Sequence, residues 1–318
     1  MESGDKKPTS AYPAPLDALV LAGTDSNPKR KIRGLNKAFL EINGKTLVRR
    51  VVESLLGASS IGLVFVVGPG EQLRKELQDL SEDVVIVDQV GKMLANSWAL
   101  IHASEARCQF GNEGVDVERP LLFISCDLPL ISPGVVDDFV ARCAQADHEF
   151  QTHFSILGGV AEETSLTRYY SGDGKPGIKR PYVHFSQLRL RLANIYVARP
   201  RKLSHQEFLQ TGFSYRKAKD WHNVMSLVRS YLGRAGGWKA AWVTLKLQLT
   251  LMAYRRDGRL YRWLRKSNSV ERIERAIGAL LGGTIKIIIT PHGGISLDVD
   301  DEKDFEVLSQ RFDDWKPL

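Results

Sequence analysis

Short apolar runs alternate with amphipathic segments through the first half of the chain. The apolar runs predict buried strands over residues 17–23, 61–69, 83–88 and 120–127. Between them, apolar residues return every three or four positions, which predicts helices over residues 44–56, 71–80, 96–106 and 133–146. Continuous apolar strands that alternate with helices are typical of a largely parallel sheet covered on both faces. The sequence therefore predicts an α/β fold with a Rossmann-like, mostly parallel central sheet.

The pattern changes in the second half of the chain. Short strand candidates occupy residues 151–202, a mostly helical stretch follows over 203–282, and a closing hairpin with a terminal helix is expected over 283–318. Residues 1–15 are polar and contain prolines without an apolar core, which predicts a disordered arm rather than an export signal. We therefore expect a single domain over residues 16–318 with a helical insertion.

An excess of basic residues is the main signal in the composition. Lysine and arginine number 44 against 37 aspartates and glutamates, a net charge of +7 that suits either an anionic partner or simple solubility. The three cysteines have no metal-ligand spacing and are expected to be reduced thiols. Because no apolar run reaches the roughly 20 residues of a membrane span, we expect a cytoplasmic protein.

The first predicted strand does not lead into the glycine-rich loop that is usual in nucleotide-binding domains. Gly23 is followed instead by a run that contains four basic residues, Lys29, Arg30, Lys31 and Arg33. Lysines and arginines can bind a triphosphate without many glycine amides, although a solvated surface loop would show the same pattern. Lys37 stands between this run and an apolar segment, and a sheltered lysine there favours a functional role.

Three aspartates are candidates for metal binding. Asp127 ends the fourth apolar strand, where it would either cap the next element or hold a cation such as Mg²⁺. Asp298 and Asp300 alternate along a predicted strand, which would point both carboxylates the same way and favour a cation between them. The acids that follow, Asp301 and Glu302, are better explained as the first turn of a helix.

These motifs occur together and in the same order in one family. The sequence resembles the MobA-like nucleotidyltransferases, which have a GT-A-like fold, in the segments LVLAG, NKAFLEINGKTLVRRVVESL, VVGP, ANSWAL, LLFISCDLPLI and LDVDDEKDF. The resemblance extends from about residue 16 to residue 308. It implies that a nucleotide is transferred from an NTP to a phosphorylated small molecule with release of pyrophosphate. It also implies Mg²⁺ as cofactor, with Mn²⁺ as an alternative.

The resemblance assigns the nucleotide to residues 16–150. The residues implied for the base and ribose are Leu21, Ala22, Gly23, Asn96 and Ser97. Lys37, together with Arg30 or Arg33, would neutralise the triphosphate and the charge of the transition state. The family usually has G-x-G-x-R after the first strand. Here Gly-Thr-Asp and a longer insertion replace that motif, so the arginine has no unique assignment.

The resemblance also implies a metal site and an acceptor site. Asp127 and Asp300 would hold the metal ion, with assistance from Asp298. The acceptor would bind in residues 151–202, at Lys179, Arg180 and Asn194. The motif V-D-x-x-x-D near the end of the chain is similar to that of cytidylyltransferases, which favours transfer of CMP and leaves GMP open.

A basic stretch in the last third of the chain suggests a further partner. Residues 229–266 contain ten lysines or arginines and one acidic residue, Asp257. Five residues at spacings of three or four form an apolar helical face: Trp238, Trp242, Leu245, Leu249 and Met252. This pattern favours either peripheral binding to an anionic membrane on its inner face or packing against the sheet. Nucleic-acid binding is less favoured, because no DNA- or RNA-binding motif accompanies the charge.

Two other functions fit parts of the sequence. Asp298–Val299–Asp300 spells the D-x-D motif of glycosyltransferases that use nucleotide-sugars, although such enzymes usually carry it nearer the middle of the chain. The altered glycine loop would also suit a nucleotide-binding regulator that has lost catalysis. The sequence carries no signal for the oligomeric state.

Overall fold

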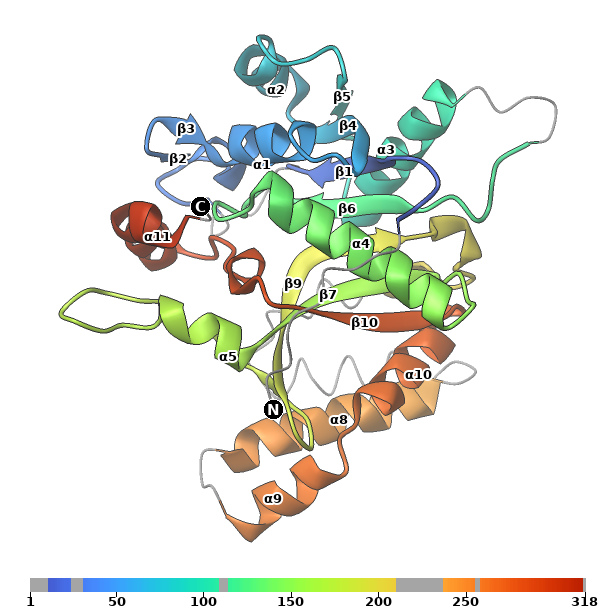
Figure 1. Cartoon of the computed structure of the whole chain (residues 1–318), viewed down its shortest axis with the longest axis vertical. Helices are drawn as coiled ribbons and strands as arrows, with labels where there is room; N and C mark the ends of the chain where they lie inside the picture. Colours follow the sequence, from blue (N-terminus) through green and yellow to red (C-terminus); the bar gives the residue numbers. More distant parts are fainter. Residues whose placement is uncertain (1–10, 24–30, 109–113, 210–236, 255–257, 317–318) are drawn as a thin grey trace.

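A mixed sheet of eight strands forms the centre of the protein (Figure 1). We describe it from a computed structural model, in which the described residues are 11–23, 31–108, 114–209, 237–254 and 258–316. Seven strands lie side by side in the order β10–β7–β9–β6–β1–β4–β5, and β8 pairs with β9. The strands are β1 (Leu16–Leu21), β4 (Ile61–Gly68), β5 (Val84–Asp88), β6 (Leu121–Ser125), β7 (Ile156–Glu162), β8 (Val183–His184), β9 (Arg189–Ala198) and β10 (Ile285–Thr290).

Among the described strands of this central sheet, β9 alone runs opposite to the others. β1 pairs in parallel with β4 and β6, and β4 pairs in parallel with β5. β9 lies antiparallel between β6 and β7, and β10 then pairs in parallel with β7. The mostly parallel α/β fold predicted from the sequence is confirmed.

Helices and short elements connect these strands. The α-helices are α1 (Leu47–Leu56), α2 (Gly70–Leu77), α3 (Met93–Arg107), α4 (Pro133–Glu149), α5 (Glu163–Leu166), α8 (Gly237–Tyr254), α9 (Arg259–Lys266), α10 (Val270–Leu281) and α11 (Glu302–Trp315). The 3₁₀ helices are η2 (Lys37–Phe39), η3 (Thr167–Tyr169), η4 (Pro200–Lys202) and η5 (Gly293–Ser296). A short hairpin is formed by β2 (Glu41–Ile42) and β3 (Lys45–Thr46).

The alternation of side chains along β1 explains why helices cover both faces of the sheet. Ala18 and Val20 belong to the same buried cluster as Val51 of α1. Leu19, which points the other way, packs in a second cluster with Leu100 of α3. Each face of the strand is therefore apolar and covered, as a parallel sheet requires.

The helices α8, α9 and α10 gather at the end of the molecule far from α1 and α2 (Figure 1). α8 contacts α9, α10 and β8, and α10 also contacts β10. The predicted helical insertion over 203–282 is helical where it is described, and residues 210–236 and 255–257 lie outside the described residues. Within the described part of the chain, no helix combines the length and the apolar character needed to cross a membrane.

Two predictions made from the sequence are wrong in the structure. The closing hairpin over 283–318 does not form, because β10 pairs with β7 and the described residues after η5 form no strand. Residues 11–15 do not belong to a disordered arm, since the Tyr12 hydroxyl donates a hydrogen bond of 3.0 Å to Asp147 Oδ2. Residues 1–10 lie outside the described residues.

Gly159 in β7 tests how tightly the sheet packs under α4. A Cβ atom added at Gly159 would lie 2.9 Å from Ile195 Cγ2 and 3.0 Å from Phe139 Cε2. We expect Gly159→Ala to lower the free energy of unfolding by about 2 kcal/mol, because the packed core has no room for another methyl group. Urea unfolding measures this. In Gly134→Ala the new Cβ would meet no described heavy atom within 4 Å, and a change of less than about 0.5 kcal/mol is expected. Equal values for the two variants would contradict the packing argument.

Candidate active site

The carboxyl ends of β1 and β6 place two predicted site segments next to each other. Leu21 pairs with Ser125 at the end of the parallel ladder, and the Cys126 amide donates to the Leu21 carbonyl at 3.3 Å. Gly23 and Asp127 therefore leave neighbouring strands at the same edge of the sheet. Ligands of open α/β sheets bind at this edge.

Asn36 fixes the start of the short helix that carries Lys37. Its side-chain nitrogen donates to the Ala22 carbonyl at 3.1 Å, and its side-chain oxygen accepts from the Ala38 amide at 3.2 Å. Asn36 thus joins the end of β1 to η2 and holds Lys37 over the sheet edge. Asn36 was not among the predicted site residues, although an asparagine directly before a helical turn is a typical N-cap.

The late acidic segment is held directly against Asp127. The Val299 amide donates to the Asp127 carbonyl at 3.2 Å, which ties the segment after η5 to the end of β6. Lys37 Nζ lies 3.5 Å from Asp127 Oδ2 and 3.8 Å from Asp300 Oδ1, and it also donates to the Val299 carbonyl. One ammonium group therefore faces two carboxylates that are distant in the sequence.

Asp298 lies in a different environment from the other two aspartates. It is 3% exposed, and its Oδ1 lies 3.5 Å from Arg191 Nη2 and 3.9 Å from Arg180 Nη2. Arg191, on β9, was not among the predicted site residues. Its sequence signal is weak, because only the antiparallel placement of β9 beside β6 brings it to this edge. Asp301 serves as the N-cap of α11, as expected from its position in the sequence.

The predicted acceptor residues differ in their placement. Arg180 lies among the acids. Its Nη2 is 2.6 Å from Asp304 Oδ2, and its Nη1 is 3.6 Å from Asp300 Oδ2. Lys179 is exposed, and its ammonium lies 5.2 Å from the centre of the Tyr170 ring. Asn194 is partly buried on β9. The next residue, Ile195, pairs with Ile124 near the end of β6.

Burial controls the ionisation of the site. It raises the pKa of Asp127, and the negative charges of Asp298 and Asp300 act in the same direction, while Lys37 opposes them. Burial lowers the pKa of Arg191, and the positive charge of Arg180 adds to that effect. A buried site that contains both acidic and basic side chains is suited to bind charged ligands.

The predicted nucleotide-binding residues line the other side of the β1 end. Ala22 is buried and Gly23 is exposed, and the side-chain nitrogen of Asn96 lies 3.0 Å from where a Cβ of Gly23 would stand. Asn96 Oδ1 accepts from the Val90 amide at 2.9 Å, which fixes its orientation. The Ser97 hydroxyl instead donates to a carbonyl of its own helix, and Leu21 is partly buried at the strand end.

Of the two candidate arginines of the basic loop, Arg33 is described, and it pairs with α11 rather than joining Lys37. Arg33 Nε lies 3.2 Å from Glu302 Oε1, and Arg33 Nη2 lies 3.6 Å from Glu306 Oε1, both on α11. Arg30 lies outside the described residues. The structure therefore brings together Lys37, the three aspartates and Arg180, and it places Arg33 on a half-exposed ion pair.

The donor chemistry of Asp127 and Asp300 fits a hard divalent cation. Both carboxylates face the position of one positive charge, the Lys37 ammonium, and carboxylate oxygens are the ligands that Mg²⁺ prefers. Asp298 fits less well, because its carboxylate faces two guanidinium groups. Among the described residues, no three acidic, histidine or cysteine side chains converge on one point as a preformed metal cage.

Three solved structures are similar to this chain, and the first of them supports this fold. A hypothetical transferase from Thermus thermophilus is 19% identical with a TM-score of 0.58, and the match covers 92% of this chain and 99% of that one. A nucleotidyl transferase from Methanothermobacter thermautotrophicus is 14% identical with a TM-score of 0.45, over 93% of this chain and 97% of that one. A CMP:2-keto-3-deoxy-manno-octonic acid synthetase complexed with CTP is 12% identical with a TM-score of 0.47, over 95% and 99%. A search of curated proteins gave no match.

The match to a protein family covers the first half of the sheet. Residues 18–155 match the sequence model of the MobA-like NTP transferase domain. They include β1, β4, β5 and β6, and with them Lys37 and Asp127. The chain therefore carries a MobA-like NTP transferase domain over residues 18–155, which confirms the family predicted from its motifs.

Proposed function

We propose that this protein is a Mg²⁺-dependent nucleotidyltransferase. It transfers a nucleoside monophosphate from an NTP to a phosphorylated small molecule or lipid head-group precursor and releases pyrophosphate. The observation that supports this most directly is the position of Lys37 between Asp127 and Asp300 at the carboxyl edge of β1 and β6. CMP is the favoured nucleotide, on the V-D-x-x-x-D motif that ends at Asp304.

The residues of the site supply charge and orientation rather than proton transfer. Lys37 would neutralise the phosphates of the NTP, and Arg180 with Arg191 would orient an anionic acceptor beside them. A phosphate acceptor is already ionised at neutral pH, so its oxygen attacks the α-phosphorus without a general base. Asp127 and Asp300 would hold Mg²⁺, which when bound would supply further neutralisation of the phosphate oxygens.

Pyrophosphate release tests the proposal. Each of the four NTPs is incubated with Mg²⁺ and a panel of phosphorylated sugars and phosphorylated amino alcohols. We expect release with one preferred NTP, CTP first among them, and loss of release when EDTA removes the metal. Turnover of a nucleotide-sugar without pyrophosphate would instead identify a glycosyltransferase. Nucleotide binding without turnover, unchanged in Asp127→Ala, would identify a regulator.

A thermal-shift screen identifies the preferred nucleotide without knowledge of the acceptor. A ligand that binds only the folded state stabilises it by about 2.7 kcal/mol at a hundredfold excess over its Kd. The preferred NTP with Mg²⁺ should therefore raise the melting temperature most clearly. A chain that responds equally to all four nucleotides, or to none, would contradict a specific nucleotide site.

A further inference from the structure

The outer faces of α8 and α9 carry large apolar side chains in contact with solvent. Trp238 and Trp242 of α8 are 60% and 59% exposed, and Trp263 of α9 is 69% exposed. Met252 and Leu260 on the same two helices are 59% and 61% exposed. Exposed apolar residues that gather on neighbouring elements indicate an interaction surface.

These exposed faces of α8 and α9 are not the faces that pack against the rest of the protein. α8 uses Ala240 and Ala241, which pack with Leu280 of α10 in a separate buried cluster. α9 uses the opposite side of its helix, where the Tyr261 hydroxyl lies 2.8 Å from His184 Nδ1. The tryptophans therefore lie outside the packed side of α8, whereas Val243 and Leu247 of the same helix pack in a cluster with Val160 of β7.

The charges on α8 and α9 are all positive, whereas the first turn of α10 carries one acid, Glu271. The described residues of α8 and α9 contain no aspartate or glutamate. They contain six basic residues, Lys239, Lys246, Arg259, Arg262, Arg265 and Lys266. A surface of this kind attracts an anionic partner and repels a second copy of itself.

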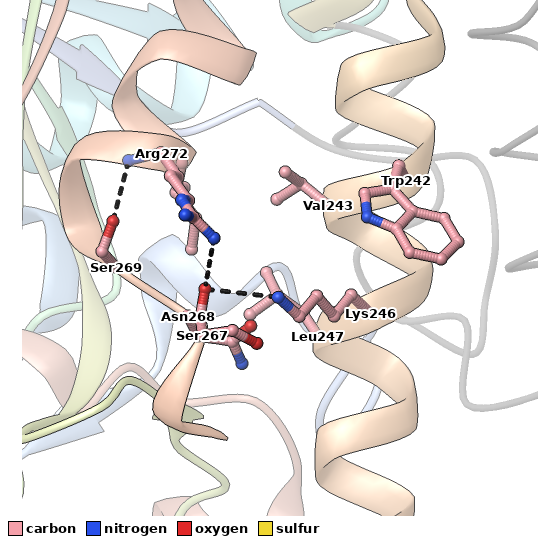
Figure 2. Close-up of a pocket in the computed structure, with 9 residues that line it drawn as sticks. Trp242, Val243, Lys246, Leu247, Ser267, Asn268, Ser269 and Arg272 are labelled. Carbon is pink, nitrogen blue, oxygen red and sulfur yellow. Dashed lines mark hydrogen bonds between the residues drawn. The ribbon is translucent and has the colours of Figure 1, made fainter. Parts of the chain in front are cut away.

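A small hollow between α8 and the start of α10 adds a specific cationic position (Figure 2). Its volume is about 70 Å³, and Trp242 stands at its rim. Lys246 Nζ and Arg272 Nη1 both donate to the Ser267 carbonyl, at 3.2 and 3.1 Å. Burial lowers the pKa of Lys246, and the charge of Arg272 adds to that effect, so an anion between the two would relieve their repulsion.

We propose that α8, α9 and the start of α10 form a docking surface for an anionic phospholipid bilayer. Trp238, Trp242 and Trp263 enter the interface between head groups and acyl chains, and the basic residues contact the lipid phosphates. One phosphate binds in the hollow between Lys246 and Arg272. Aliphatic side chains among the tryptophans suit an acyl boundary better than stacked bases, which favours lipid over nucleic acid.

Flotation of the full-length protein with vesicles tests the surface. We expect it to float with vesicles of equal parts phosphatidylglycerol and phosphatidylcholine at low salt, and to remain at the bottom with phosphatidylcholine alone. Trp238→Ala with Trp263→Ala should lower the vesicle partition coefficient roughly tenfold, because the apolar anchor is lost. Both side chains are exposed, so the melting temperature should not change.

A second pair of variants tests the hollow between Lys246 and Arg272. Lys246→Gln with Arg272→Gln should lower the partition coefficient about 25-fold, since each basic residue at an anionic surface contributes about fivefold. The control, Lys45→Gln with Lys75→Gln, removes the same charge from exposed positions at the other end of the molecule and should leave partition nearly unchanged. Equal losses in the two double variants would overturn the docking surface.

Three further results would overturn the proposal. They are failure to float with anionic vesicles, tighter binding to a single-stranded oligonucleotide than to vesicles, and a dimer in solution that disappears in the tryptophan variant. All are measured on the purified chain without substrate. They therefore remain distinguishable from failure of the pyrophosphate assay.

Discussion

Asp127→Asn should lower pyrophosphate release by about 10³-fold and leave the protein at least as stable as the wild type. Asparagine keeps the shape of the side chain but removes the negative charge that would hold the metal ion. The Asp127 side chain is only 9% exposed at the end of β6, and its Oδ2 lies 3.5 Å from Lys37 Nζ.

The stability part of this prediction follows from the ionisation of Asp127. Burial raises its pKa in the folded protein, so the folded chain holds this proton more tightly than the unfolded chain. Stability contributed by the protonated form is lost as the pH rises through the folded pKa. At neutral pH without metal, the ionised carboxylate therefore costs stability. Asparagine removes that cost, and Lys37 keeps Asp300 as its charged partner at 3.8 Å.

The measurements are pyrophosphate release with Mg²⁺ and the melting temperature in EDTA. Asp17→Asn is the matched control, because Asp17 is also a buried aspartate of this sheet, bound to Ser104 Oγ and Arg119 Nη2 at 2.6 Å each. It lies at the amino end of β1, away from the site, and should keep its activity. An active Asp127→Asn protein would exclude the proposed metal site.

Lys37→Met should lose both activity and stability. Its Nζ is the positive charge that faces Asp127 and Asp300, and the Lys37 side chain is only 18% exposed. Removal of one partner from a buried ion pair leaves an uncompensated charge, and we expect a loss of about 3 kcal/mol in the free energy of unfolding. Pyrophosphate release should fall by about 10²- to 10³-fold, because the triphosphate loses its neutralising group.

Urea unfolding and the pyrophosphate assay measure the two effects. Lys45→Met is the control, since Lys45 is 49% exposed and pairs with Glu53 at 2.7 Å, and exposed pairs contribute less than about 1 kcal/mol. The double variant Lys37→Met with Asp127→Asn should recover part of the stability but none of the activity. A stable and inactive Lys37→Met protein would show that Lys37 is not needed to balance the acids.

Local patterns in the sequence were sufficient for the first half of the fold. The apolar run of β1 leads into Gly23 and that of β6 leads into Asp127, and both residues mark the carboxyl edge of the sheet. Lys37 was found because an apolar segment follows a basic run. These signals are local, so they do not depend on how the second half folds.

Partners chosen by tertiary structure could not be predicted in this way. Arg191 reaches Asp298 because β9 runs antiparallel beside β6, and nothing in the sequence fixes that neighbour. The hairpin prediction failed for the same reason. An apolar run such as β10 can pair either with an antiparallel strand across a turn or with a distant parallel strand. In the structure it pairs in parallel with β7.

The hydrogen bond from Val299 to the Asp127 carbonyl has a consequence for synthesis of the protein on the ribosome. The strands that lead to Gly23 and Asp127 can form while the chain is still growing, but Asp300 is translated long after Asp127. A nascent chain can thus assemble the nucleotide half early, whereas the proposed chemistry must wait for the segment that contains Asp300. Truncated products that lack this segment would bind substrate at most, and release no pyrophosphate.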